Sequence, residues 1–471
     1  MRRAKGALIK DPLCAKALVL DDGSTRLAIV AVDTVDFAGV DGDIGSDFVP
    51  KLRARIQKEL KIPGCHVLVN ASHVHTPRGI LCSPAEQVDR TFETVKRAVS
   101  NMTAARVGAG AGRERRIAMN RTLRLKSGKH WTIRHANPCP PDEAVAGVGP
   151  MDPEIGLIRI DRMDGRPLAV VYNFACHPLF GDARRGAVSA NFPSVASSVI
   201  EEALGQEAMA IFLQGAGGDA IDVLFKDFNR PRDIEPLGTM LGLTALKALR
   251  RIRTRNVKLN IISGTIRLPR RRDIPERIGE LRREQAELLE SLRSTSLNFK
   301  SFLPRYLEHL LDPAHPSHYS YRYLQEDKIG SDQLAAMDSH NKACIEKYLN
   351  NIYAMEKLAR IQERIANYKL CQAENDVADE PTVEAEVQGI KIGDCIVITS
   401  PAEMVAEVGL KLKKASPYKH TFIAACSNGY IYYAPAASDY GKGGYEATTC
   451  LLAPEWQKIY EDKANEIIRR L

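Results

Sequence analysis

Residues 65–77 read Cys-His-Val-Leu-Val-Asn-Ala-Ser-His-Val-His-Thr-Pro. The apolar first half predicts a buried strand, and the polar second half predicts a loop at its carboxyl end. Side chains alternate along a strand, so His73 and His75 are expected on the same face. Imidazole is the commonest protein ligand for metals, and strand ends that open into loops often carry catalytic groups. The stretch therefore predicts a metal-binding strand end in an α/β enzyme.

The composition is that of an ordinary globular protein. The 471 residues are 44% hydrophobic and 26% charged, and the length allows two to four domains. No apolar run approaches the roughly 18 residues of a membrane span, and no signal-peptide core follows the basic N-terminus. The net charge of +8 lies in clusters without interleaved aromatic residues, which argues against nucleic-acid binding.

The ten cysteines include no CxxC pair, which favours free thiols in a reducing compartment. We therefore expect a cytoplasmic protein as the sequence stands, and a secreted or periplasmic one if its N-terminus is truncated.

Strand and helix patterns alternate along most of the chain. Strands are predicted at 17–20, 27–32, 66–70, 156–160, 168–175, 208–213 and 258–268, and helices at 46–60, 85–102, 194–204 and 236–251. Residues 274–370 have charged helical segments with apolar stripes, and strands return after residue 380. We predict a layered, mixed-sheet α/β metallohydrolase domain (1–273 and 371–471) with a helical-hairpin insertion (274–370). Residues 301–323 are expected to form the tip of the hairpin or a second lip of a cleft.

Four motifs whose residues could bind a metal or act in catalysis each follow an apolar strand. They are Ser72-His73-Val74-His75, the run from Asn173 to Pro178 that carries His177, Ser400-Pro401-Ala402-Glu403, and the run from Cys426 to Tyr430. Glu403 is expected in the first turn of a helix. A lone histidine, a lone helix-start carboxylate or a lone tyrosine is more often structural. Their coincidence at strand ends indicates a catalytic zinc site, which needs N and O ligands and an open position.

Two glycine-rich runs need separate interpretation. Residues 108–112, Gly-Ala-Gly-Ala-Gly, lack a following helix, so we predict a turn or bulge rather than a dinucleotide site. Residues 214–219, Gln-Gly-Ala-Gly-Gly-Asp, lack the Lys-Ser/Thr of a phosphate loop. Glycines there let a backbone approach a ligand or supply N–H donors to an oxyanion, so Gly217, Gly218 and Asp219 are substrate-site candidates.

These motifs together resemble the catalytic domain of the neutral/alkaline non-lysosomal ceramidase family. The resemblance rests on Asp11-Pro12-Leu13, Asn-Ala-Ser-His-x-His, Asn120-Arg121, the runs 173–178, 189–193 and 214–219, Pro401-Ala402-Glu403, Asn428-Gly429-Tyr430 and Tyr445-Glu446. It implies a zinc-dependent hydrolase with His73, His177, Glu403 and Tyr430 as ligands. It also implies that His75 positions substrate or water, that Tyr430 and Arg121 act in catalysis, and that Tyr440 and Arg78 lie at the substrate pocket.

The departures from the family bear on the substrate. The family carries a serine shortly after the Gly-Asp pair, whereas this chain reads Asp219-Ala220-Ile221-Asp222. After the second histidine, Thr76-Pro77-Arg78 replace the family's serine and small residue. Because an unpaired guanidinium against an alkyl chain is costly, we expect a small-molecule substrate more polar than a long-chain ceramide. We predict hydrolysis of an amide (N-acyl) bond. The alternatives are an ester or glycosidic bond at the same site, or a non-catalytic binding protein.

An amidohydrolase barrel, which also begins with His-x-His, is disfavoured. Such barrels need further metal-binding His and Asp residues on later strands, whereas the later candidates here are Glu403 and Tyr430. The expected partners are a small-molecule substrate and, through the helical insertion, a second copy of the chain. No nucleic acid and no transmembrane segment are expected.

Overall fold

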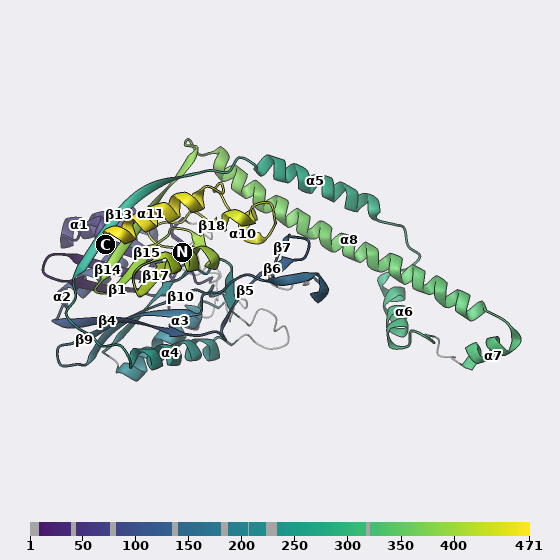
Figure 1. The fold of residues 1–471 in the computed structure, drawn as a ribbon, viewed down its shortest axis with the longest axis horizontal. Helices are drawn as coiled ribbons and strands as arrows, with labels where there is room; N and C mark the ends of the chain where they lie inside the picture. Colours follow the sequence, from purple (N-terminus) through teal and green to yellow (C-terminus); the bar gives the residue numbers. More distant parts are fainter. Residues whose placement is uncertain are drawn as a thin grey trace. The chain divides into compact units, whose positions relative to one another are not determined.

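The computed structural model describes residues 9–38, 44–75, 82–133, 140–179, 187–205, 207–222, 233–316 and 321–471. The chain divides into two compact units, Met1–Arg271 with Glu374–Leu471, and Arg272–Ala373. Mixed sheets covered by helices build the first unit (Figure 1), so the predicted fold class is confirmed. Among the described residues, none of the helices has both the length and the apolar character that crossing a bilayer requires.

The first sheet has the order β1-β2-β3. Strands β1 (Ala15–Asp21) and β2 (Arg26–Val32) are antiparallel, and β3 (Val67–Ala71) runs parallel to β2. Helices α1 (Phe48–Leu60) and α2 (Pro84–Ser100) bury their apolar stripes against one face. Helix α2 begins with a capping box in which Ser83 and Glu86 each bond the other's backbone N–H.

The second sheet has the order β11-β10-β9-β4. Its strands are β4 (Ala105–Arg113), β9 (Glu154–Arg162), β10 (Pro167–Phe174) and β11 (Met209–Gln214), and α3 (Asn191–Leu204) and α4 (Glu235–Leu249) cover one face. The predicted turn or bulge at 108–112 is wrong, because these residues pair regularly with β9 inside β4. A Cβ at Gly108 would lie 2.3 Å from the Arg253 carbonyl oxygen, so close packing explains the glycine.

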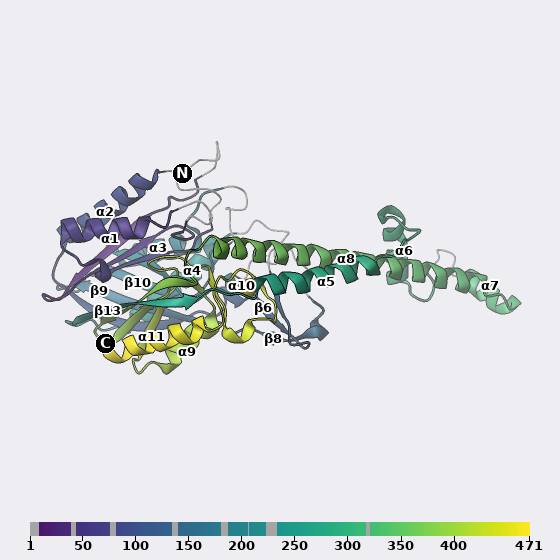
Figure 2. The ribbon, with the colours of Figure 1, turned by 90° about the horizontal axis from the view of Figure 1, so that it is seen from above.

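The third sheet has the order β13-β14-β15-β17. Its strands are β13 (Leu259–Pro269), β14 (Thr382–Ile392), β15 (Cys395–Thr399) and β17 (His420–Ala424). Helices α9 (Ala406–Ala415) and α11 (Trp456–Arg470) pack on its outer face. The inner faces of all three sheets share one apolar core, in which Ile29, Val171 and Val397 are buried. Figure 2 shows the sheets between α1 and α2 on one side and α9 and α11 on the other.

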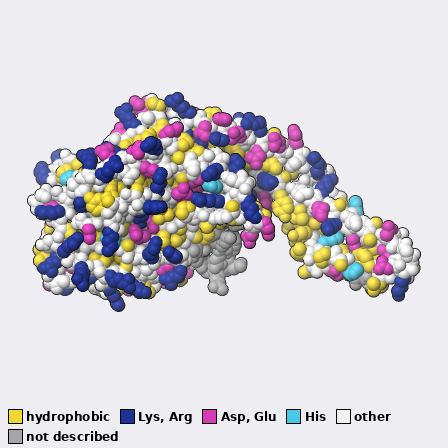
Figure 3. All heavy atoms as spheres, viewed as in Figure 1, with side chains coloured by type: hydrophobic (Ala, Val, Ile, Leu, Met, Phe, Trp, Pro, Cys, Tyr) yellow, Lys and Arg dark blue, Asp and Glu magenta, His cyan; other side chains and the backbone are white. Residues whose placement is uncertain are grey.

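Short elements complete the first unit around the strand ends. Strand β12 (Ala220–Asp222) pairs with β5 (Ala118–Asn120), and β16 (Glu403–Met404) pairs with β18 (Tyr433–Ala434). Strands β6 (Thr122–Leu125), β7 (His130–Thr132) and β8 (Val145–Val148) form a small sheet of order β7-β6-β8, and α10 (Tyr445–Thr448) is a single turn. On the face drawn in Figure 3, Lys and Arg side chains are spread among acidic and apolar ones.

The second unit contains more helices than the predicted hairpin. Helices α5 (Ile274–Ser291) and α8 (Gln333–Asp376) supply the two arms, and Asn351 of α8 bonds both the N–H and the carbonyl of Arg293, at 3.0 and 2.7 Å. The expected tip contains two further helices, α6 (Phe299–Leu311) and α7 (Tyr321–Ile329). Phe302 of α6 stacks on Tyr348 of α8, with 4.5 Å between ring centroids.

Candidate metal centre

Two buried asparagines join the carboxyl ends of strands from all three sheets. The Asn70 amide, in β3, donates to the Ala425 carbonyl at 2.7 Å, and its oxygen accepts the Gln214 N–H at 2.9 Å. The Asn173 amide, in β10, donates to the Leu213 carbonyl at 3.0 Å and the Ile423 carbonyl at 2.9 Å. Because every one of these strands ends at the same place, the loops that follow are brought together.

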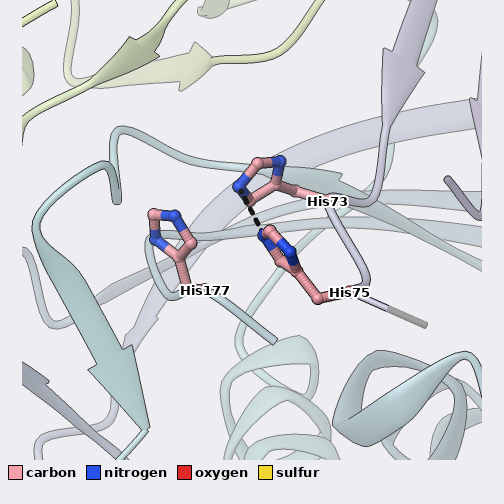
Figure 4. A group of neighbouring side chains, drawn as sticks. All are labelled: His73, His75 and His177. Carbon is pink, nitrogen blue, oxygen red and sulfur yellow. Dashed lines mark hydrogen bonds between the residues drawn. The ribbon is translucent and has the colours of Figure 1, made fainter. Parts of the chain in front are cut away.

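His73 and His75 converge, although not for the predicted reason. Strand β3 ends at Ala71, and His73 has a φ of 60°, so strand alternation does not orient the two rings. Their Nε2 atoms lie 3.3 Å apart (dashed line in Figure 4). The Nδ1–H of His73 donates to the Val35 carbonyl at 2.8 Å, which turns its Nε2 toward the centre.

His177 reaches the same point from the loop after β10. Its ring centroid lies 4.6 Å from that of His73 (Figure 4). Its Nδ1–H donates to the Gly217 carbonyl at 2.6 Å, and its Nε2 lies 2.8 Å from Glu403 Oε2. As for His73, a backbone carbonyl fixes the ring so that the Nε2 lone pair faces inward.

Glu403 lies between the two histidines. It is only 4% exposed, its Oε2 is 3.1 Å from His73 Nε2, and its Oε1 accepts a hydrogen bond from the Tyr430 hydroxyl. The prediction that Glu403 begins a helix is wrong. Glu403 forms part of β16, where it pairs with Tyr433 of β18, and α9 begins three residues later.

The donor set fits a bound cation. With each Nδ1 proton committed to a carbonyl, His73 Nε2, His177 Nε2 and Glu403 Oε2 converge on one buried point, and a cation bound there in place of a proton would take a lone pair from each of them. The ligand atoms of His73, His75 and His177 lie within 4.8 Å of one another, so this cluster could hold a metal ion. Neutral imidazole and carboxylate are ligand types that suit zinc.

The pKa values of the three histidines are shifted by burial and by the charged groups around them. Burial alone would lower the pKa of His73, but the Glu403 carboxylate and Cys426 together outweigh it and hold that pKa well above its ordinary value. Burial, with Arg121 and His73 nearby, lowers the pKa of His177 to about 4. Burial and the two neighbouring histidines also hold the pKa of His75 well below its usual range, so this ring is neutral.

Arg121 connects to the centre through residues that the sequence analysis did not assign to the site. Its Nη2 donates to the Tyr433 hydroxyl at 3.1 Å, which lies 3.3 Å from His177 Nε2, and its Nε donates to Glu446 at 2.7 Å. The guanidinium therefore touches Tyr433 rather than the histidines. The sequence contains one signal that could have identified Tyr433 as a site residue: it follows the same sharp turn as Tyr430.

The glycine-rich run 214–219 holds His177 in place through the Gly217 carbonyl and does not offer N–H donors to a substrate. The Gly217 N–H donates to the Gly215 carbonyl and the Gly218 N–H to the Met404 carbonyl, each at 2.8 Å. The Asp219 carboxylate accepts from Ala406 N–H at 2.8 Å and from the Asn120 amide at 2.7 Å. The expected oxyanion role of Gly217 and Gly218 is corrected accordingly, since both N–H groups already have carbonyl partners.

The two remaining substrate-site candidates differ in outcome. The Tyr440 hydroxyl donates to the Leu452 carbonyl at 2.8 Å, and its ring lies beneath the Arg271 guanidinium at 5.2 Å. Tyr440 thus serves packing around the third sheet, where it contacts that core. Arg78 lies outside the described residues.

Comparison with known proteins identifies the fold. No protein-family model and no curated protein sequence matches the chain. A crystal structure of neutral ceramidase from Pseudomonas aeruginosa is similar, with a TM-score of 0.62 and 17% identity over 99% of this chain and 70% of the other. This chain has a neutral-ceramidase-like fold. A ceramidase complexed with C2 is also similar, with a TM-score of 0.61 and 17% identity over 99% of this chain and 71% of the other.

Proposed function

We propose that the protein is a zinc-dependent hydrolase that cleaves an amide bond of an N-acyl compound. The observation that carries the proposal is the convergence of His73, His177 and Glu403, with each imidazole fixed by a backbone carbonyl. The similarity of the fold to that of neutral ceramidases favours an amidase over other metal-dependent hydrolases.

The residues of the centre have separable tasks. His73, His177, Glu403 and Tyr430 would hold the ion. A bound zinc supplies a Lewis acid and brings the pKa of water at its open position to about 7. His75 is neutral and half-buried, so it can accept a proton or orient the scissile group. Burial beside Glu403 raises the pKa of Tyr430 and keeps it protonated, and this proton, now donated to Glu403 Oε1, would turn to a developing oxyanion.

Arg121 is proposed to act as a positioning residue. It is buried, and Glu446 and the Gly218 carbonyl hold two sides of its guanidinium at 2.7 and 2.8 Å. Its third contact, the Tyr433 hydroxyl, orients a phenol that stacks on the His177 ring at 6.3 Å. Arg121 therefore fixes Tyr433 against His177.

We propose a substrate smaller and more polar than a long-chain ceramide. The support is the sequence, which has Thr76-Pro77-Arg78 directly after the second histidine and lacks the family's serine after Asp219. A guanidinium near the acyl group would favour a polar or anionic substituent over an alkyl chain.

Metal analysis tests the centre without relying on activity. The purified chain should contain one zinc per molecule by mass spectrometry, and His73→Ala and His177→Ala should lose it, because removing one of four ligands leaves a poor site. His340→Ala, an exposed residue of α8, is the matched control and should retain zinc. Stoichiometric zinc in both ligand variants would contradict the assignment.

A substrate panel tests the chemistry. N-acyl amides with polar and with long alkyl groups, and the corresponding esters, are compared with and without a chelator. Chelator-sensitive release of a carboxylate from the polar amides supports the proposal. Turnover of esters alone would favour the ester alternative, efficient cleavage of long-chain ceramide would refute the substrate class, and no turnover by the zinc-loaded protein would favour a binding protein.

A further inference from the structure

A cavity of about 1000 Å³ lies at the opposite end of the sheets from the metal centre. It is bordered by β1, the end of α2, and the beginnings of β4, β10 and β11. Of these, β1, α2 and β4 are labelled together at the left of Figure 1. His177 and Gly217 follow the other ends of β10 and β11. At about 3.3 Å per residue, the eight residues of β10 separate the two places by roughly 25 Å. The volume reaches the upper end of the range of small-molecule sites, about 300–1,000 Å³.

The floor of the cavity is apolar. Leu18 and Leu20 of β1 line one side, and Ile160 of β9 and Leu168 of β10 line the other. These side chains belong to, or pack against, the core shared by the three sheets. Leu18, Leu20 and Ile160 are buried at 7%, 9% and 0% exposure, so the floor is a packed apolar wall, and a wall of this kind favours an apolar occupant.

The acidic groups that border the cavity are mostly satisfied by the protein itself. Asp21 accepts from Gly23 N–H and from Arg26 at 2.8 Å, and Asp22 accepts from Leu259 N–H at 2.9 Å. Lys16 is likewise paired, with Glu201 at 2.7 Å. The charge that these groups present to a ligand is therefore small.

Unlike these paired charged groups at the cavity, Arg162 has a hydrogen-bond donor that no described residue satisfies. Its Nε is buried and has no hydrogen-bond partner among the residues that the structure describes. Its nearest carboxylate is Glu207 at 3.8 Å, beyond hydrogen-bond distance, and that side chain is 74% exposed. A buried guanidinium N–H without an acceptor costs free energy, so an acceptor supplied by a ligand would be stabilising. Arg97, at the end of α2, is a second cation at the same cavity and has no ion pair within the described ranges.

We propose that this cavity is a second binding site that takes an amphipathic carboxylate, with its anionic head on Arg162 and its alkyl tail along Leu18 and Leu20. Arg162 and Arg97 supply the positive end, and a planar guanidinium matches a carboxylate with two parallel hydrogen bonds. The apolar floor takes the tail. The site requires neither the metal nor the proposed amidase activity, so it stands or falls separately from them.

Calorimetric titration of the full, zinc-loaded chain with decanoate, below the concentration at which it forms micelles, tests the site. Decanoate should bind saturably with one site per chain, and both decanol, which lacks the charge, and butyrate, which lacks the tail, should bind at least tenfold more weakly. Decyl phosphate shows whether the head must be a carboxylate. A decyl phosphate affinity equal to that of decanoate would overturn carboxylate selectivity.

Variants locate the ligand. Arg162→Gln should weaken decanoate binding about tenfold or more, the effect of losing a hydrogen bond to a charged group. Arg166→Gln is the matched control, because Arg166 belongs to the same hairpin, pairs with Asp164 and does not border the cavity. Leu168→Gln, which is close in size, should weaken decanoate but not butyrate. If Arg162→Gln does not fold, Arg162→Lys replaces it, and the loss of the planar fork should still weaken binding.

His73→Ala distinguishes this cavity from the metal centre. Decanoate binding should survive this substitution and be weakened by Arg162→Gln. Binding that is lost in His73→Ala and unchanged in Arg162→Gln would place the ligand on the metal and overturn the proposal. So would decanol that binds as tightly as decanoate, or the absence of saturable binding.

Discussion

Replacement of Asn70 by alanine should destabilise the protein and empty the metal centre together. The Asn70 side chain is fully buried and bonds three groups: the Ala425 carbonyl at 2.7 Å, the Ser427 hydroxyl at 2.9 Å and the Gln214 N–H at 2.9 Å. In Asn70→Ala the Gln214 N–H loses its acceptor, whereas the Ala425 carbonyl keeps the Ser427 hydroxyl as a donor at 3.3 Å. A buried polar group left unsatisfied costs about 1–3 kcal/mol, so the Gln214 N–H alone gives about 1–3 kcal/mol.

This loss is large against a typical total of about 5–15 kcal/mol. Urea unfolding followed by circular dichroism gives the change in free energy, and mass spectrometry of the folded variant gives its zinc content. Asn260→Ala, an exposed residue of β13, is the control and should change stability by no more than about 0.5 kcal/mol. If Asn70→Ala unfolds within 1 kcal/mol of the parent protein, or keeps full zinc, Asn70 does not join the strand ends as argued.

Other outcomes follow from single contacts. Gly218→Ala would place a Cβ 2.5 Å from the Glu403 carbonyl oxygen, so it should lower zinc content, whereas Gly147→Ala meets no atom within 4 Å and should not. Burial raises the pKa of Asp219 to about 6, with Glu446 raising and Arg121 lowering it. Between about pH 4 and about pH 6, the Asp219 carboxyl is therefore protonated in the native state and ionised in the unfolded chain. The Asp219 contribution to the unfolding free energy should therefore fall by about 3 kcal/mol as pH rises from about 4 to about 6, and Asp219→Asn should flatten that slope in urea titrations. Phe299, Leu303, Leu307 and Leu310 lie on one face of α6 and are 62%, 40%, 44% and 60% exposed. If this face joins two copies, Leu303→Lys with Leu307→Lys should give monomers in light scattering, whereas an unchanged mass would exclude it.

Most of the centre could be predicted because its residues follow strands that are strongly apolar. The runs before His73, His177 and Glu403 are buried strands, and their carboxyl ends meet because β2 and β3, β10 and β11, and β15 and β17 are parallel pairs. An apolar run predicts a buried strand, and the order of residues in that run shows which of its ends is the carboxyl end.

Contacts across the sheets could not be predicted in the same way. The run 108–112 looks like a turn because glycine is poor in strands, and only the approach of Arg253 and Ile252 explains why it is a strand. Glu403 follows a proline and precedes a helix, but pairing with Tyr433, thirty residues later, fixes it in β16. The roles of Tyr433 and Glu446 likewise depend on Arg121, which lies far away in the sequence.

Backbone strain at the centre supports a functional rather than a merely structural role for these loops. Among the described residues, His73, Cys426, Asn428 and Tyr432 have φ values of 60°, 51°, 64° and 64°, which cost about 1–2 kcal/mol each outside glycine. Hydrogen bonds hold three of them in place. Asn428 exchanges bonds with Val69 at 2.8 and 2.9 Å, the Cys426 N–H donates to Ala402 at 3.3 Å, and the Tyr432 carbonyl accepts from Glu403 at 3.0 Å. A loop that served only to connect strands could relieve this strain with glycine. Its retention where His73, Glu403 and Tyr430 meet is expected if the backbone must deliver those three side chains to one point.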